Sequence, residues 1–130
     1  MGISRGTRKS HVIRAALESI AFQVADALKL MEQTGTPLHQ LNADGGASIN
    51  PVLMQFQADL LGVPVKKAAI TELSAMGSAY ISGHCMGLWE NASDVEADLE
   101  GTLYLPRMDE TTRNTKLESW RRAVGRVLSR

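Results

Sequence analysis

Residues 38–61 read LHQLNADGGASINPVLMQFQADLL, and this stretch decides the fold. An extended run at 38–43 meets two glycines, Gly45 and Gly46, and a helix is predicted from Pro51 onward with Asn50 as its N-cap. Consecutive glycines let the backbone turn tightly and expose its N–H groups. A junction of this kind can receive a polar or anionic ligand, although an ordinary turn of an α/β unit has the same pattern.

Upstream of this junction, residues 10–34 are predicted to form a long helix that begins at Ser10 and stops at Gly35. Its apolar residues recur at three- and four-residue steps, which is typical of one buried helical face. We expect that face to consist of Ile13, Leu17, Ile20, Val24, Leu28 and Met31.

Downstream, the helix at 51–61 is expected to bury four residues and to turn three polar ones outward. The expected core residues are Leu53, Phe56, Leu60 and Leu61, and the outward ones are Gln55, Gln57 and Asp59. A second extended run at 63–70, a helix of small residues at 74–86 and a last helix at 112–128 follow. Trp89 and Trp120 are expected to anchor these last two helices.

The order of these elements indicates an α/β layer with the strands in one sheet. Two strands make a poor sheet, so a further strand is expected, either unrecognised in this sequence or outside it. A short extended piece at 103–106 is one candidate.

The composition allows one modest domain with a real core, since 44% of the 130 residues are hydrophobic. The net charge of zero gives no reason to expect nucleic acid or an anionic membrane as a partner. No run approaches the roughly 18 apolar residues of a membrane span. The lone cysteine, Cys85, cannot form an internal disulfide, which favours a reducing, cytoplasmic setting.

Complete catalytic motifs are absent from the sequence. It contains no GxxxxGK[ST], GxGxxG or GxSxG and no cluster with metal-ligand spacing. No two carboxylates are placed as an evident acid–base pair. We therefore predict no catalytic residue and no metal ligand, and one turn able to receive a ligand.

Seven segments, in order and with matching spacing, resemble the second domain of the FGGY carbohydrate kinases, most closely the glycerol kinases of that family. They are residues 2–7 (GISRGT), 11–23 (HVIRAALESIAFQ), 44–50 (DGGASIN), 53–62 (LMQFQADLLG), 71–80 (TELSAMGSAY), 87–89 (GLW) and 111–124, with TTRN at its start and WRRAV at its end. Residues 44–50 look like the adenosine motif of the family. The resemblance covers nearly the whole chain.

The resemblance implies part of an actin-like, ribonuclease-H-like ATPase domain. Residues 1–130 would form the carboxy-terminal part of the second, nucleotide-side domain. ATP would lie in the cleft between two domains, and its γ-phosphoryl group would move, with Mg²⁺, onto a hydroxyl of glycerol or a related polyol or sugar held by the first domain. The implied nucleotide-binding residues are Gly45, Gly46, Ala47 and Asn50. Gly46 would bring its backbone against the nucleotide, and Ser48 would help to shape the same wall.

The catalytic aspartate, the phosphate-binding loop and the polyol-binding residues of the family belong to sequence upstream of Met1. Phosphoryl transfer needs several such parts. We therefore expect a domain truncated on its amino-terminal side and inactive alone. The expected partners are ATP and, through the missing domain, the polyol or sugar, without nucleic acid or membrane; a homo-oligomer is compatible with the chain.

Three alternatives stay open at this stage. The first is another FGGY sugar kinase, such as a pentulose kinase. The second is a non-catalytic structural or oligomerisation module with an ATPase-like fold. The third uses the basic last helix as a nucleic-acid surface, against which the neutral overall charge argues.

Overall fold

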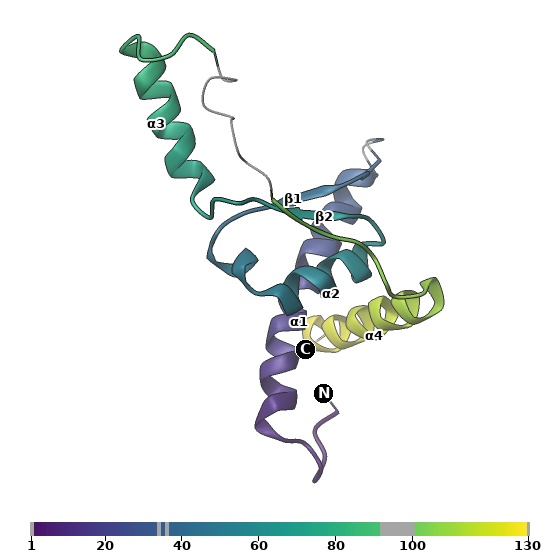
Figure 1. Ribbon diagram of the computed structural model, residues 1–130. Coiled ribbons are helices and arrows are strands. Elements are labelled where there is room, and N and C mark those ends of the chain that lie inside the picture. Colours follow the sequence, from purple (N-terminus) through teal and green to yellow (C-terminus); the bar gives the residue numbers. More distant parts are fainter. Residues whose placement is uncertain (1, 34, 36, 92–100, 130) are drawn as a thin grey trace.

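The computed structural model describes residues 2–33, 35, 37–91 and 101–129. Its elements alternate between helix and strand, as predicted (Figure 1). In chain order they are α1 (Lys9–Glu32), β1 (Leu41–Ala43), the short 3₁₀ helix η1 (Gly46–Ile49), α2 (Pro51–Leu61), β2 (Val65–Lys67), α3 (Leu73–Cys85), β3 (Thr102–Tyr104) and α4 (Glu110–Leu128).

The three strands form one sheet in the order β1-β2-β3. β1 runs parallel to β2, with Leu41 opposite Val65, and β3 runs antiparallel to β2, with Tyr104 opposite Val65. β3 is thus the further strand that was expected, although it begins one residue before the predicted stretch at 103–106 and ends at Tyr104. The other two strands are shorter than predicted, at three residues each.

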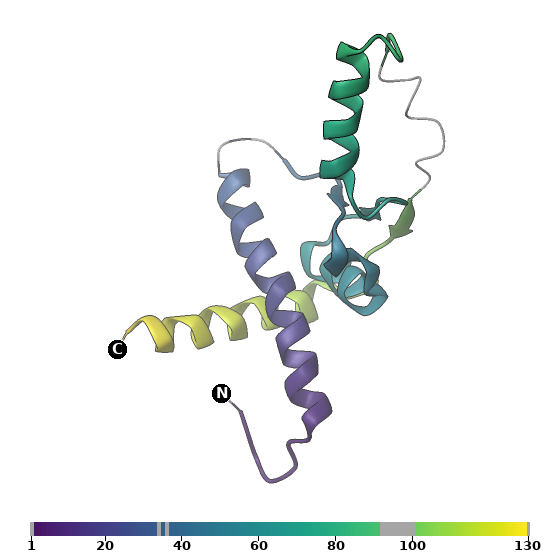
Figure 2. The same ribbon diagram turned by 90° about the vertical axis from the view of Figure 1, so that its left-hand side faces the viewer.

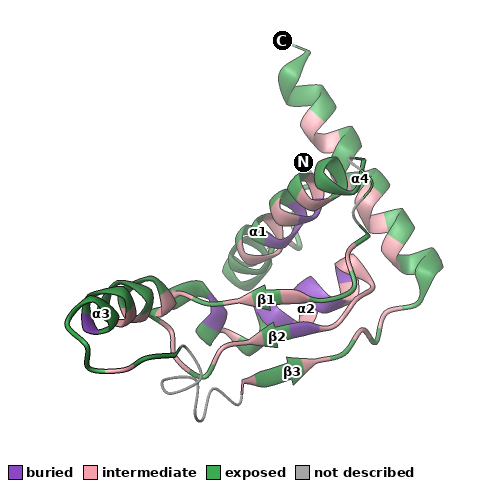
Figure 3. Cartoon of the chain, turned by 90° about the horizontal axis from the view of Figure 1, so that it is seen from above, coloured by how far each residue is buried: buried purple, intermediate pink, exposed green. Residues whose placement is uncertain are grey.

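The core lies around α2, which is the most deeply buried helix in the described part of the chain (Figure 3). Phe56 of α2 meets Phe22 of α1 edge to face, with ring centroids 5.7 Å apart. The buried hydrophobic residues are Ala21, Phe22, Ala25, Leu53, Met54, Phe56, Ala58, Leu60 and Val65. The expected burial of Leu53, Phe56 and Leu60 is confirmed, and Leu61 packs half-buried against this core.

None of the six residues predicted to form the buried face of α1 is fully buried. Ile13, Ile20 and Met31 are exposed, and Leu17, Val24 and Leu28 are half-buried, whereas Ala21, Phe22 and Ala25 are buried. In the described part of the chain, α2 and α4 pass the middle of α1, where these three buried residues join the core (Figure 2). The helix also begins at Lys9 rather than Ser10, and it ends at Glu32, before residue 34, which lies outside the described residues.

The predicted outward orientation of Gln57 is also wrong. Its side chain was expected to face outward, yet it is buried, and its amide donates a hydrogen bond of 3.4 Å to the carbonyl of Ala21. Because α1 covers that face of α2, a long amide side chain can be buried there with its donor satisfied.

α3 extends away from the sheet and is mostly exposed (Figures 1 and 2). The predicted anchoring by Trp89 is confirmed, since its indole nitrogen donates to the carbonyl of Tyr80 at 3.0 Å. The Trp89 ring lies directly against Gly83, so a side chain at Gly83 would displace it. Close packing therefore explains Gly83, whereas Gly77 faces open space.

α4 docks through Trp120, as predicted, with its ring stacked on Phe22 at 5.1 Å. The helix begins earlier than predicted, at Glu110, because the carboxylate of Asp109 accepts a hydrogen bond from the Thr112 amide at 2.9 Å. Val127 and Leu128, at the end of the helix, are exposed. None of the helices among the described residues has the length and apolarity needed to cross a membrane.

Candidate functional site

The turn between β1 and α2 contains all four residues predicted to bind the nucleotide. Gly45 has φ +83° and ψ 172°, a conformation that side-chain-bearing residues rarely adopt. Its N–H donates to the carbonyl of Thr71 at 2.9 Å. Two residues earlier, at the end of β1, the carbonyl of Ala43 accepts from the Ala68 amide at 2.9 Å. The turn is therefore fastened to the loop that leads from β2 to α3.

Gly46 differs from Gly45, because nothing in the described structure requires it to be glycine. Its φ lies outside the left-handed region, and a Cβ built on it would meet no atom within 4 Å in the described part of the chain. Gly46 and Ala47 are both exposed. The backbone at Gly46 therefore faces open space that a ligand could approach closely.

Ser48 lies behind this open face and is only 2% exposed. Its hydroxyl donates to the carbonyl of Gly45 at 2.7 Å, and its N–H donates to the same oxygen at 3.0 Å. Ser48 was expected to shape the wall of the site, but no contact was predicted for it. A serine three residues after a turn glycine is the local signal that could have indicated one.

Asn50 caps α2, as predicted. Its Oδ1 accepts hydrogen bonds from the amides of Val52 at 3.0 Å and Leu53 at 3.2 Å, and Pro51 occupies the first helical position. Among the described residues, no group accepts a hydrogen bond from its side-chain NH₂. The oxygen can therefore cap the helix while the NH₂ donates to a ligand, so the two roles expected of Asn50 are compatible.

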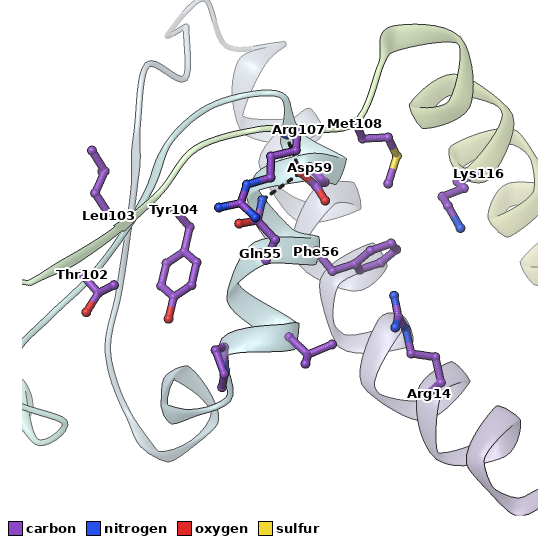
Figure 4. Close-up of a pocket in the computed structure, with 12 residues that line it drawn as sticks. Arg14, Gln55, Phe56, Asp59, Thr102, Leu103, Tyr104, Arg107, Met108 and Lys116 are labelled. Atoms are coloured by element: carbon purple, nitrogen blue, oxygen red, sulfur yellow. Dashed lines mark hydrogen bonds between the residues drawn. The ribbon is translucent and has the colours of Figure 1, made fainter.

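A separate open groove of about 600 Å³ runs along α2 toward α4 (Figure 4). Pro51 and Val52, which follow Asn50, contribute to its lining, but the four predicted residues do not. Three cationic side chains line the groove, and they are Arg14, Arg107 and Lys116.

Most polar groups of this groove make contacts within the protein. Arg14 pairs with Glu18 at 2.7 Å, and the Lys116 ammonium lies over the Phe56 ring. One carboxylate oxygen of Asp59 accepts hydrogen bonds from the Gln55 side chain and from the Arg107 amide. Gln55 and Asp59, expected simply to face outward, thus fasten the segment after β3 to α2.

The described residues contain no group of side chains suited to bind a metal ion. Within residues 2–33, 35, 37–91 and 101–129, no group of three or more His, Cys, Asp or Glu side chains is placed to hold a metal ion. Cys85 is exposed with a free thiol. The candidate site is therefore the turn at residues 45–50, with an open backbone at Gly46, a buried support at Ser48 and an amide donor at Asn50.

Comparison with known sequences gives a family match over two thirds of the chain. The family described as "FGGY family of carbohydrate kinases, C-terminal domain" matches residues 1–86. The glycerol kinase of Pseudothermotoga lettingae is 45% identical over 98% of this chain, and that of Dechloromonas aromatica is 46% identical over 98%. In both comparisons the chain spans 26% of the relative's length.

Solved structures share the fold. The crystal structure of Plasmodium falciparum glycerol kinase with ADP matches with a TM-score of 0.81 and 31% identity, covering 97% of this chain and 26% of that one. A ligand-bound xylulose kinase from Lactobacillus acidophilus matches with a TM-score of 0.75 and 21% identity, covering 99% of this chain and 26% of that one. The predicted fold class, an α/β part of the ATPase domain of these kinases, is confirmed.

Proposed function

This chain belongs to the FGGY family of carbohydrate kinases, and on that basis we propose that it forms the nucleotide-side wall of an ATP-dependent kinase. The chain would be the carboxy-terminal part of the second domain. In the complete enzyme, the γ-phosphoryl group of ATP is transferred, with Mg²⁺, to a hydroxyl of glycerol. A cytoplasmic setting belongs to the same proposal.

The open backbone at Gly46 is the observation that carries this proposal. Since neither φ nor packing requires glycine there, a close approach by a ligand accounts for the missing side chain. The proposed contacts to the adenosine part of ATP come from the backbone of Gly45, Gly46 and Ala47 and from the side-chain NH₂ of Asn50. These groups fit a neutral heterocycle and its ribose. We assign no residue of this chain to Mg²⁺.

The chain would bind nucleotide without transferring phosphate by itself. Phosphoryl transfer depends on positioning and charge stabilisation by several parts of an enzyme, and the chain spans only 26% of its relatives' length. The turn at residues 45–50 offers a wall and no general base. We expect weak binding of ATP, because a single wall buries only part of the ligand.

Glycerol is the favoured substrate over a pentulose for a specific reason. Relatives near 45% identity over the chain are named glycerol kinases, whereas a xylulose kinase resembles the chain at 21% identity. The polyol would be bound by parts of the enzyme outside the turn described here.

Calorimetric titration with Mg-ATP tests the proposal. A Cβ at Gly46 meets no atom of the described chain within 4 Å, so Gly46→Val should occupy the space in front of the turn, weaken binding and leave stability nearly unchanged. Asn50→Ser keeps an N-cap oxygen and removes the NH₂ donor, and we expect it to weaken binding as well.

Gly77→Val is the matched control, because Gly77 lies in α3, away from the turn, and also faces open space. It should bind ATP as the wild type does. Equal affinity in all four proteins would overturn the proposed site.

A further inference from the structure

Ser48 combines burial with a concentration of hydrogen bonds on one acceptor. It is one of two polar residues in the described chain that are buried, the other being Gln57. Both of its donors, the hydroxyl and the backbone N–H, go to a single oxygen, the carbonyl of Gly45. A buried hydroxyl that makes a 2.7 Å hydrogen bond to one backbone carbonyl restrains the peptide to which that carbonyl belongs.

That peptide needs a restraint because it joins two glycines. Glycine has more backbone freedom than any other residue, so the Gly45–Gly46 peptide has no side chain on either flank to limit its rotation. The Gly45 N–H is held by Thr71 on one side. On the other side, Ser48 provides both hydrogen bonds to the Gly45 carbonyl.

The direction of the Gly46 N–H follows from the direction of the Gly45 carbonyl. A trans peptide is planar, so its N–H points opposite to its C=O. Because the carbonyl is held toward buried Ser48, the Gly46 N–H points away from Ser48.

We propose that Ser48 is a positioning residue for the nucleotide, which acts by holding the Gly45–Gly46 peptide in the orientation that the ligand meets. Ser48 itself does not touch the ligand, since its hydroxyl is buried and engaged. This inference rests on the proposed function for the contact with nucleotide. The restraint on the peptide is independent of any ligand.

The test compares Ser48→Ala with Gln57→Leu. Each removes one hydrogen bond from a buried polar side chain to a backbone carbonyl, but Gln57 bonds to Ala21 in α1, outside the turn. The first readout is the NMR order parameter of the Gly46 N–H in the ligand-free chain, and the second is the Kd for Mg-ADP.

In Ser48→Ala we expect the Gly46 order parameter to fall from about 0.85 to below about 0.6, and the Kd to rise roughly 3- to 10-fold, the equivalent of one lost hydrogen bond. Gln57→Leu should change neither value. An unchanged order parameter in a folded Ser48→Ala chain would overturn the proposal, as would an unchanged Kd. If the wild-type chain fails to bind ADP, the proposed function fails, while the order parameter still decides whether Ser48 holds the peptide.

Discussion

The indole nitrogen of Trp120 lies 2.6 Å from Oδ2 of Asp26 and joins α4 to α1 across 94 positions of sequence. The same indole ring is nearly parallel to the ring of Phe22, with 7° between their planes. A single side chain of α4 therefore makes one apolar and one polar contact with α1.

Replacing Trp120 by Phe separates these two contacts. The aromatic ring stays on Phe22, but the hydrogen bond to Asp26 is lost, so we expect the free energy of unfolding to fall by about 1–3 kcal/mol. Trp120→Ala loses both contacts and should cost about 3 kcal/mol or more. Urea denaturation followed by far-UV circular dichroism measures both values. Trp89→Phe is the control, because Trp89 follows the projecting α3 and packs back on it. It should cost less than Trp120→Phe; equal losses would contradict this description of α4 docking.

Replacing Gly62 or Gly125 by alanine should change the stability of the chain in opposite directions. Gly62 ends α2 with φ +72°, and the guanidinium of Arg113 lies directly against it, so Gly62→Ala is strained and must displace Arg113. We expect a loss of at least about 1 kcal/mol. Gly125 lies inside α4 with open space around it, so Gly125→Ala should stabilise the chain by up to about 1 kcal/mol. Thermal unfolding of the two variants tests the difference, and a shift in the same direction for both would refute it.

Asp109 should make the start of α4 sensitive to acid. The hydrogen bond from the Thr112 amide, followed by that from the Thr112 side chain, lowers the pKa of Asp109 below its ordinary value of 3.8. A carboxylate with a lowered pKa in the folded state contributes stability above its unfolded pKa, and this contribution is lost as pH falls through the folded pKa. Asp109→Asn keeps a capping oxygen without a titrating group.

We therefore expect the unfolding midpoint of the wild type to fall more steeply below about pH 4 than that of Asp109→Asn. Circular dichroism melts between neutral and acidic pH measure this difference. Parallel pH profiles of the wild type and Asp109→Asn would show that titration of Asp109 does not contribute to the pH dependence of stability.

Asn50 should show its capping role in stability measurements without ligand. Asn50→Ala removes the oxygen that accepts from Val52 and Leu53, so it should lower the free energy of unfolding by about 1 kcal/mol. Asn50→Ser should change it by only a few tenths, because serine caps nearly as well. Equilibrium denaturation distinguishes the two variants. A serine variant as unstable as the alanine variant would show that the side-chain oxygen is not the stabilising group.

Helix starts and stops were predicted well where one residue type determines the local backbone. Asn50 and Pro51 begin α2 and Gly62 ends it, because a cap, a fixed φ and a left-handed residue act within a few positions of sequence. The two tryptophans were also placed correctly, since a large amphipathic ring at the end or on one side of a helix needs a partner surface.

Burial was predicted less well because it depends on which elements cross. The apolar periodicity of α1 extends over its whole length, yet its buried residues, Ala21, Phe22 and Ala25, lie in the middle of the helix, where they join the core. Gln57 is polar and still buried, because α1 offers a carbonyl at that point. A three-residue strand such as β3 carries too little periodicity to be delimited from sequence.

The candidate turn was likewise predictable from local sequence only in part. Its glycines and its cap were recognisable as a turn and a helix start, and the family resemblance indicated the nucleotide. The hydrogen bonds from Ser48 to Gly45 and from Gly45 to Thr71 could not be predicted, because the first depends on a buried rotamer and the second on how β1 and β2 pair.

The most direct test of the proposed nucleotide site is a ¹H–¹⁵N NMR titration of this chain with Mg-ADP. We predict that the backbone amides of Gly45, Gly46 and Ala47 and the side-chain NH₂ of Asn50 shift with one common saturation curve, and that Gly46→Val abolishes those shifts. Shifts confined to the groove around Phe56 and Lys116, with Gly46 unchanged in a folded chain at high ADP concentration, would contradict it.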